Sequence, residues 1–217
     1  MDTLKTLILN RFRVLSLLTV SMVLSLVLLM IRVKLHQSFY LLFLVWNLFL
    51  AVIPFAITTT LISTSKPSKI QFLLSFGVWL LFLPNAPYII TDLLHLRSSQ
   101  QYLMWLDVLV IVSFAFNGLI LFMLSLSDME KLLKLYLKPK VVLTLLLTIF
   151  GLTAFGVYLG RFLRYNSWEI MNNPMALFSD IINIIIQPNI EAWIFTLTFG
   201  AFLAITYWVL KAFSKSY

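Results

Sequence analysis

Long apolar runs separated by short polar stretches dominate the hydrophobicity pattern of this chain. Six runs approach or exceed the roughly 20 helical residues that cross a hydrocarbon core. They are residues 14–31, 40–61, 70–83, 105–126, 141–160 and 192–210. The third run is the shortest and ends at Pro84, so the next helix should be short and lie at the interface or re-enter the bilayer. The pattern predicts an all-α membrane protein, a six-transmembrane-helix bundle with residues 1–217 forming one transmembrane domain.

Polar residues gather directly after the third run, where residues 84–96 read P-N-A-P-Y-I-I-T-D-L-L-H-L. Asn85 fits the N-cap of a helix and Pro87 fits its first turn, so a short helix should begin here. At about 100° per residue, one helical face carries four polar side chains, with apolar residues around them. These four are Tyr88, Thr91, Asp92 and His95. A polar stripe in such an apolar chain predicts a functional site, although the pattern does not identify its chemistry.

The composition agrees with a membrane protein. Hydrophobic residues make up 61% of the chain and charged residues 11%, whereas about a quarter of the residues of soluble domains are charged. The chain has no cysteine, which excludes disulfides, thiolate metal sites and cysteine nucleophiles. The first apolar run ends in R-V-K-L-H-Q without a small-residue cleavage site. We therefore expect an uncleaved first span rather than a signal peptide.

The charges of the loops predict the orientation. Eleven lysine and arginine residues fall on the side of the N-terminus and five on the other side. This asymmetry places both termini in the cytoplasm. The net charge of +8 then belongs to the cytoplasmic side and indicates no nucleic-acid partner. The lysine-rich segment 130–140 should form a helix that lies against anionic lipid headgroups.

The same orientation brings most of the unusual polar residues to the outer side of the bundle. Ten of them are expected to converge on one outer pocket: Asn47, Asn85, Tyr88, Asp92, His95, Asp107, Tyr158, Arg161, Arg164 and Asn166. The cytoplasmic half is expected to be dry apart from residues 58–60 and Gln71. Residues 179–186 resemble an amphipathic helix at the outer surface.

Metal binding is one chemistry that the pocket residues suggest. Asp92 and His95, three residues apart, could direct both side chains at one ion, with Asp107, Glu169 or Glu191 completing the shell. A hydrogen-bonded Asp–His pair that stabilises the proline-rich turn is the favoured alternative. No metal site is therefore predicted.

Anion binding and acid–base catalysis are two further chemistries that the pocket residues suggest. Arg161 and Arg164 could bind a phosphate bidentately, or form ion pairs with outer acids. Asn166 would line the pocket, although its spacing to Glu169 also fits a helix cap.

Asp92, His95 and Asp107 are candidate catalytic residues, with His95 as the base. The remaining pocket residues would bind substrate: Asn47, Asn85, Tyr88, Tyr158, Arg161, Arg164 and Asn166. No nucleophile motif, P-loop or dinucleotide fingerprint is present. Whether the protein is an enzyme stays open, and the residues do not identify a cofactor.

Four motifs resemble those of an uncharacterised bacterial multi-pass membrane family, a domain of unknown function. They are W-N at 46–47, L-P-N-A-P-Y-x-x-T-D-L-x-H-L at 83–96, W-x-D at 105–107, and Y-L-G-R-F-x-R-x-N-S-W at 158–168. The resemblance implies a bacterial membrane protein without an assigned activity. It supports the choice of site residues and names no substrate.

We expect a multi-pass membrane protein of unknown molecular activity whose outer pocket binds or processes a polar lipid or a lipid-linked headgroup. A small-solute transporter or permease is one alternative, and it would need polar residues through both halves of the bundle. A non-catalytic membrane assembly subunit is another, in which the same polar residues stabilise the structure.

Overall fold

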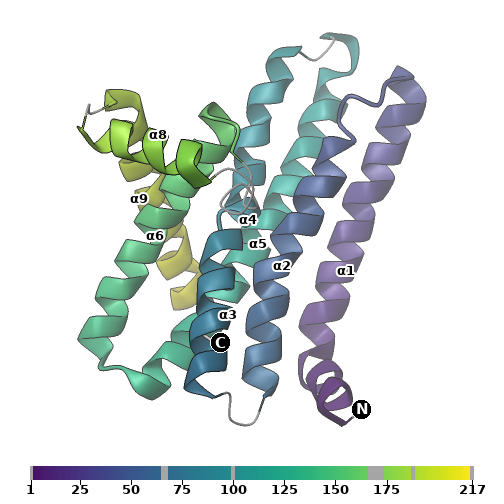
Figure 1. Cartoon of the computed structure of the whole chain (residues 1–217). Coiled ribbons are helices and arrows are strands. Elements are labelled where there is room, and N and C mark those ends of the chain that lie inside the picture. The colour runs from purple at the N-terminus through teal and green to yellow at the C-terminus, as the bar shows by residue number, and fades with distance from the viewer. Residues whose placement is uncertain (1, 65–67, 99–100, 166–173, 187–188, 216–217) are drawn as a thin grey trace. The chain divides into compact units, whose positions relative to one another are not determined.

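The computed structural model describes residues 2–64, 68–98, 101–165, 174–186 and 189–215 (Figure 1). Within these ranges every regular element is helical. Six helices are long and apolar enough to cross a membrane. The prediction of an all-α membrane protein with six spans is therefore confirmed. The chain divides into two compact units, Met1–Leu132 (unit 1) and Leu133–Tyr217 (unit 2). A single transmembrane domain stays a prediction.

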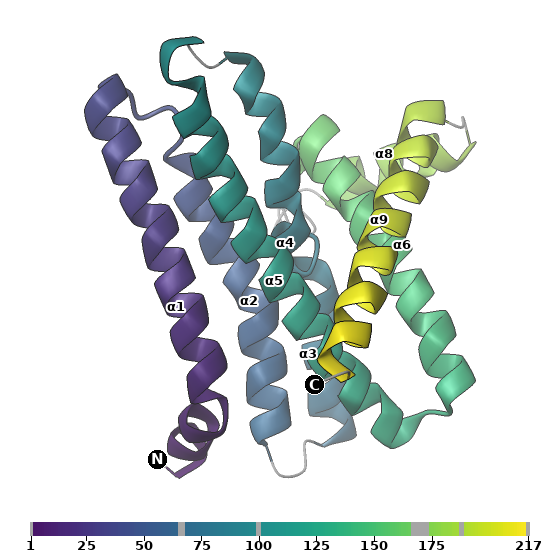
Figure 2. The same ribbon diagram turned by 180° about the vertical axis from the view of Figure 1, so that it is seen from behind.

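Unit 1 contains α1 (Asp2–His36), α2 (Phe43–Ser63), α3 (Lys69–Phe82) and most of α5 (Met104–Tyr136). These four helices run alongside one another in both ribbon views (Figures 1 and 2). At one end of unit 1, called here the Arg32 end, α1 ends and α2 and α5 begin. At the opposite end, called the Arg11 end, α2 ends and α3 begins.

A proline-rich break follows α3. The chain continues through α4 (Asn85–Tyr88) into two 3-10 helices, η1 (Ile89–Ser98) and η2 (Gln101–Leu103). Pro87 lies in the first turn of α4, as predicted. The prediction of Asn85 as N-cap was wrong, because the backbone of Pro84 is already helical and Asn85 is the first residue of α4. The Asn85 Nδ2 instead donates to the Phe82 carbonyl at 2.9 Å and covers the end of α3.

Helix α4 rests directly on the backbone of α5. A Cβ added to Gly118 would lie 2.3 Å from the Ala86 carbonyl oxygen and 3.1 Å from the Ile89 Cδ1. Only glycine permits this approach, because real Cβ atoms do not come so close to an oxygen. Gly118 therefore sets the position from which η1 starts.

Unit 2 contains α6 (Pro139–Phe162), α8 (Pro174–Ile186) and α9 (Ile190–Lys215). α6 and α9 pack as an antiparallel pair. A Cβ added to Gly200 of α9 would lie 3.5 Å from the Phe150 carbonyl oxygen of α6. α8 contributes Ile184 to an apolar cluster with Tyr158 of α6 and Ala192 of α9. The short helix expected at 179–186 is thus real and begins five residues earlier.

Helix α5 extends ten residues beyond the predicted end of the fourth span, to Tyr136. The prediction of one helix over 130–140 was wrong, because the chain leaves helical structure after Tyr136 and α6 begins at Pro139. Proline fits the first turn of a helix but cannot extend the preceding one.

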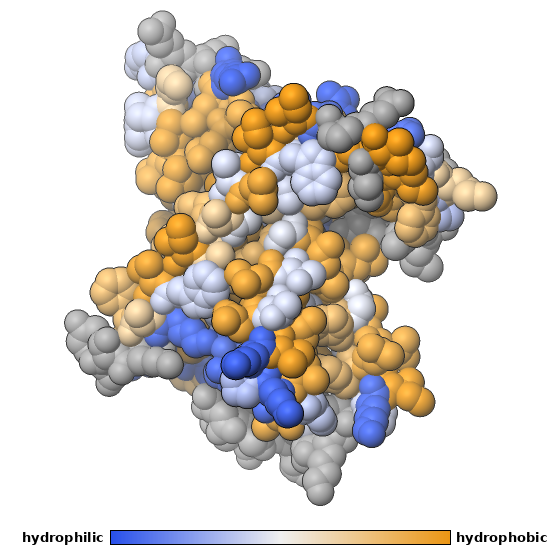
Figure 3. Space-filling model, turned by 90° about the vertical axis from the view of Figure 1, so that its left-hand side faces the viewer, coloured by the Kyte–Doolittle hydropathy of each residue, from blue (hydrophilic) through white to orange (hydrophobic). Residues whose placement is uncertain are grey.

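Apolar side chains cover much of the described surface. On the face shown in Figure 3, hydrophobic residues predominate and hydrophilic ones gather mainly towards the lower part of the view. Large side chains such as Leu73 (69% exposed) and Leu197 (69% exposed) lie on the outside of the long helices. An apolar surface of this extent suits contact with lipid chains.

Candidate functional site

Asp92 and His95 lie next to each other on η1. A 3-10 helix has about three residues per turn, so that side chains at i and i+3 are aligned. The His95 Nε2 lies 3.9 Å from the Asp92 Oδ1, and Asp92 is 1% exposed. The expectation of an α-helix, which turns by about 100° per residue, was wrong from Ile89 onwards, because the chain forms a 3-10 helix there. Thr91 belongs to a neighbouring row, where its hydroxyl donates to the Tyr88 carbonyl at 2.6 Å.

The chain at and just before the start of α2 supplies the partners of this pair. The Asn47 Nδ2 donates to the Asp92 Oδ2 at 2.9 Å. The Tyr40 hydroxyl lies 2.9 Å from the His95 Nδ1 and shares a hydrogen bond with it. The Phe43 ring packs against the imidazole, with centroids 4.7 Å apart. Together these contacts form a polar line from a buried carboxylate through an imidazole to a phenol that is 39% exposed.

Tyr40 was not among the predicted site residues. A sequence signal for it exists, because Tyr40, Phe43 and Asn47 have the i, i+3, i+7 spacing of one helical face. That spacing alone does not say which segment the face meets. The tertiary structure places it against η1.

Asp107 is part of a buried ion pair. Its Oδ1 lies 2.8 Å from the Arg32 Nε, and their side chains are 0% and 4% exposed. The Arg32 Nη1 also donates to the Ser38 carbonyl at 2.8 Å, which ties the turn after α1 to the same group. Arg32 was missed as a site residue because it directly follows an apolar run and reads as a loop cation. The geometry of Asp107 fits an ion pair that holds α1 to α5.

Four of the ten predicted pocket residues belong to unit 2. Tyr158 is buried and accepts a hydrogen bond from the Asn189 Nδ2 at 3.2 Å. Arg161 lies in the last turn of α6, and Arg164 follows that helix with a left-handed φ of 62°. Asn166 lies outside the described residues. The structure brings Asn47, Asp92 and His95 together, whereas convergence of all ten residues stays a prediction.

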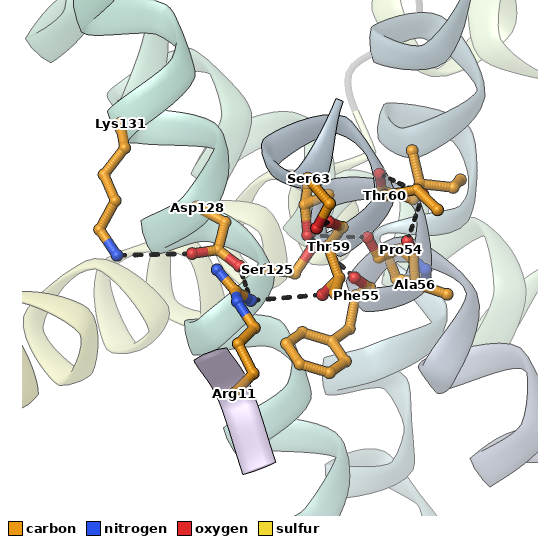
Figure 4. A network of polar contacts seen from close by, with 12 residues as sticks. Arg11, Pro54, Phe55, Ala56, Thr59, Thr60, Ser63, Ser125, Asp128 and Lys131 are labelled. Carbon is orange, nitrogen blue, oxygen red and sulfur yellow. Dashed lines mark hydrogen bonds and ion pairs between the residues drawn. The ribbon is translucent and has the colours of Figure 1, made fainter. Parts of the chain in front are cut away.

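A second polar cluster occurs at the Arg11 end (Figure 4). Arg11 forms an ion pair with Asp128 and donates to the Thr59 hydroxyl at 3.3 Å. Lys131 approaches the Asp128 Oδ1 at 3.5 Å. The prediction that this half would be dry was wrong, because it treated Asp128 as a loop residue. In the structure α5 continues past Asp128, which is 3% exposed.

Further buried hydrogen bonds link the helices of unit 1. The Trp79 Nε1 donates to the Ser125 hydroxyl at 2.8 Å, and the Thr58 hydroxyl lies 3.4 Å from the same oxygen. Midway along α5, the Asn117 Nδ2 donates to the Ser25 hydroxyl at 3.0 Å. This hydrogen bond links α5 to α1.

Polar contacts fix the register of α1 against α5 along the line where the two helices meet, called here the α1–α5 seam. Arg11 pairs with Asp128 and Arg32 pairs with Asp107, so both helices span 21 residues between the two ion pairs. At about 1.5 Å of rise per residue the pairs lie ~31 Å apart, close to the ~30 Å thickness of a hydrocarbon core. Asn117 ties the seam between them. Both ion pairs join α1 to α5, one at the Arg11 end and one at the Arg32 end.

The described side chains contain no group of three His, Cys, Asp or Glu residues that could together hold a metal ion. Asp92 is hydrogen-bonded to Asn47, and His95 is hydrogen-bonded to Tyr40. Their arrangement suits hydrogen bonding and proton exchange with a ligand.

Six long apolar helices with paired polar groups between them define a helical multi-pass membrane protein. The chain belongs to the family described as "Protein of unknown function (DUF1361)", whose family model matches residues 46–206. The resemblance to an uncharacterised family is thereby confirmed. No curated protein and no solved structure matches the chain. The matched range includes Asn47, Asp92 and His95, whereas Arg11, Arg32 and Tyr40 precede it.

Proposed function

We propose that this protein binds the polar headgroup of a lipid, or of a lipid-linked molecule, at the membrane surface next to the Arg32 end, and that His95 exchanges a proton with the bound headgroup. The line from Asp92 through His95 to Tyr40 is the observation that carries this proposal. Exposure rises along it, with Asp92 at 1% and Tyr40 at 39%. A ligand at the surface would therefore meet a hydroxyl and an imidazole supported by a buried carboxylate.

The electrostatics of the line favour one tautomer of His95. Because the Nε2 faces the Asp92 carboxylate, a proton on that nitrogen is stabilised. The Nδ1 is then left to accept the Tyr40 hydroxyl proton at 2.9 Å. When a ligand oxygen replaces or extends this contact, His95 can accept a proton and Asp92 stabilises the resulting imidazolium.

The surroundings favour a ligand that is both polar and apolar. Large hydrophobic side chains close to the line in sequence are exposed, namely Phe39 (73%), Leu42 (45%) and Leu94 (45%). Arg97 lies exposed on η1, two residues after His95, and a guanidinium binds phosphate well. A lipid would place its headgroup at the polar line and its chains against this apolar rim.

The proposal includes an orientation. We place the Arg32 end on the outer side of a bacterial plasma membrane, with both termini in the cytoplasm, because eleven of the sixteen lysine and arginine residues then lie inside. The chain has no cysteine of its own. Single substitutions Tyr102→Cys and Ser68→Cys can therefore be probed with a membrane-impermeant maleimide on intact cells. Labelling of Tyr102→Cys alone supports the orientation, and labelling of Ser68→Cys alone reverses it.

The functional test uses both histidines of the chain, His36 and His95. His95→Gln should fold like the wild type but lose the lipid that co-purifies in mild detergent, measured by mass spectrometry. Tyr40→Phe should weaken the same retention, whereas the matched controls His36→Gln and Tyr102→Phe should keep it. Equal lipid retention by His95→Gln and the wild type would disprove the headgroup proposal. Loss of folding in both Asp92→Asn and His95→Gln would favour an assembly subunit with structural polar residues.

A small-solute transporter is the second candidate, supported by polar groups at three depths of the α1–α5 seam. These are Arg11 with Asp128, Ser25 with Asn117, and Arg32 with Asp107. Proteoliposomes holding a pH-sensitive dye would test its proton-coupled form under an imposed pH gradient. A proton flux above that of empty liposomes, abolished by Asn117→Leu, would favour the transporter. The headgroup proposal expects no such flux.

A further inference from the structure

An apolar groove of about 290 Å³ runs between α1 and α5 in the half of unit 1 next to the Arg11 end. Its walls come from both helices: Leu17, Leu18 and Ser21 of α1, and Phe116, Ile120 and Leu124 of α5. Leu17 is 63% exposed and Phe116 is 55% exposed, so the groove is open towards the surroundings of the helices. In a bilayer these surroundings are lipid chains.

Polar contacts between α1 and α5 lie at and just beyond the two ends of the groove. Towards the membrane centre, Asn117 lines the groove and donates to the Ser25 hydroxyl at 3.0 Å and to the Ser21 carbonyl at 3.3 Å. At the other end, one turn before Val14, Arg11 pairs with Asp128. From Val14 to Ser21 the groove extends about 10 Å along α1. A single leaflet has a hydrocarbon depth of ~15 Å, so the groove matches most of one lipid chain.

Positive charge predominates where the groove reaches the Arg11 end. Lys131 keeps 68% of its side chain exposed beside Asp128, and Arg13 is exposed two residues after Arg11. Asp128 accepts contacts from both Arg11 and Lys131, so these four residues together carry two excess positive charges. Basic residues at this depth attract anionic headgroups.

We propose that this groove holds one acyl chain of an anionic phospholipid from the leaflet at the Arg11 end, with the phosphate beside Lys131 and Arg13. Apolar walls alone would not distinguish one lipid from another, because bilayer chains are as apolar as the groove. The positive charges of Lys131 and Arg13 select an anionic headgroup, and the groove fixes the position of the acyl chain. This lipid site lies at the opposite end of unit 1 from His95 and does not depend on the proposed function.

Native mass spectrometry of the full chain, released from vesicles of phosphatidylcholine and phosphatidylglycerol at 3:1, tests the proposal. The wild type should retain one phosphatidylglycerol per chain more than a variant whose groove is filled. Ile120→Trp fills the groove and should abolish that retention. Leu109→Trp is the matched control, since Leu109 is 44% exposed and lies eleven residues away, ~16 Å along the same face of α5. It should retain the lipid.

Two further variants separate charge from shape. Lys131→Gln, at an exposed position where folding should be kept, should lower phosphatidylglycerol retention about fivefold. His36→Gln, at the opposite end of unit 1, should leave this retention unchanged. Equal retention by Ile120→Trp and the wild type, equal loss in Leu109→Trp, or equal retention of phosphatidylcholine would each overturn the proposal. Should Ile120→Trp fail to fold, an unchanged lipid count in Lys131→Gln would overturn it.

Discussion

The guanidinium of Arg32 and the carboxylate of Asp107 lie 2.8 Å apart, and each side chain is at least 96% buried. Removing one partner leaves a buried charge without its counter-charge, which typically costs about 3–5 kcal/mol. Arg32→Met should therefore lower the free energy of unfolding by that amount. Thermal unfolding in detergent would measure the loss, with Lys34→Met, exposed two residues away, as the control.

The double variant Arg32→Met/Asp107→Leu tests whether Arg32 and Asp107 contribute to stability as a pair. Replacing both members of a buried ion pair with apolar residues is often close to neutral. We expect the double variant to recover most of the stability that Arg32→Met loses. A double variant as unstable as the sum of its single variants would show that the two residues do not act as a pair.

Gly118 and Gly77 provide a matched pair of glycine substitutions within unit 1. Gly118→Ala places a methyl group 2.3 Å from the Ala86 carbonyl oxygen, whereas the same methyl at Gly77 meets nothing within 4 Å. Gly118→Ala should destabilise the protein by about 1–3 kcal/mol. Gly77→Ala should stabilise helix α3 by ~0.5–1 kcal/mol. Unfolding in detergent checks both signs, and equal effects would contradict the close approach of α4 to α5.

The hydrogen bond from Trp79 to Ser125 tests how much buried polar contacts contribute in this bundle. The Nε1–Oγ distance is 2.8 Å, and both residues are 0% exposed. In membrane proteins such contacts average about 0.6 kcal/mol and reach ~1.7 kcal/mol. A double-mutant cycle of Trp79→Phe and Ser125→Ala should give a coupling energy in this range. A coupling near zero would mean that the two helices pack without help from this bond.

Arg164 holds a left-handed backbone conformation after the end of α6, with φ at 62°. This conformation costs a non-glycine residue about 1 kcal/mol. Arg164→Gly should therefore raise stability by ~0.5–1 kcal/mol, while Arg161→Gly in the last helical turn should lower it. The two melting temperatures should move in opposite directions. If Arg164 also binds a ligand, the more stable variant would lose that binding.

The residues that could be chosen from the sequence share one property. Asn47, Asp92 and His95 are polar groups in or next to apolar runs, where a polar side chain requires a partner. The structure brings these three residues together, whereas their role in a functional site stays a prediction. Tyr40 and Arg32 escaped selection because each lies at the edge of an apolar run, where polar groups are ordinary.

Local geometry explains two of the errors. Asn85 was expected to begin a helix, but Pro84 is already helical and makes a cap unnecessary. The row that joins Asp92 to His95 depends on a 3-10 helix, which sequence periodicity does not distinguish from an α-helix over so few residues. Both errors fall in the segment that packs closely against α5 at Gly118, through Ala86 and Ile89.

The sequence by itself determined that six segments are long and apolar enough to cross a membrane, because the transfer free energy of a segment depends only on its own length and side chains. It also determined which polar residues would need partners. Only the tertiary structure decided which residues those partners are. Arg11 meets Asp128 across 117 residues and Arg32 meets Asp107 across 75, since such pairs depend on which helices lie side by side and in what register.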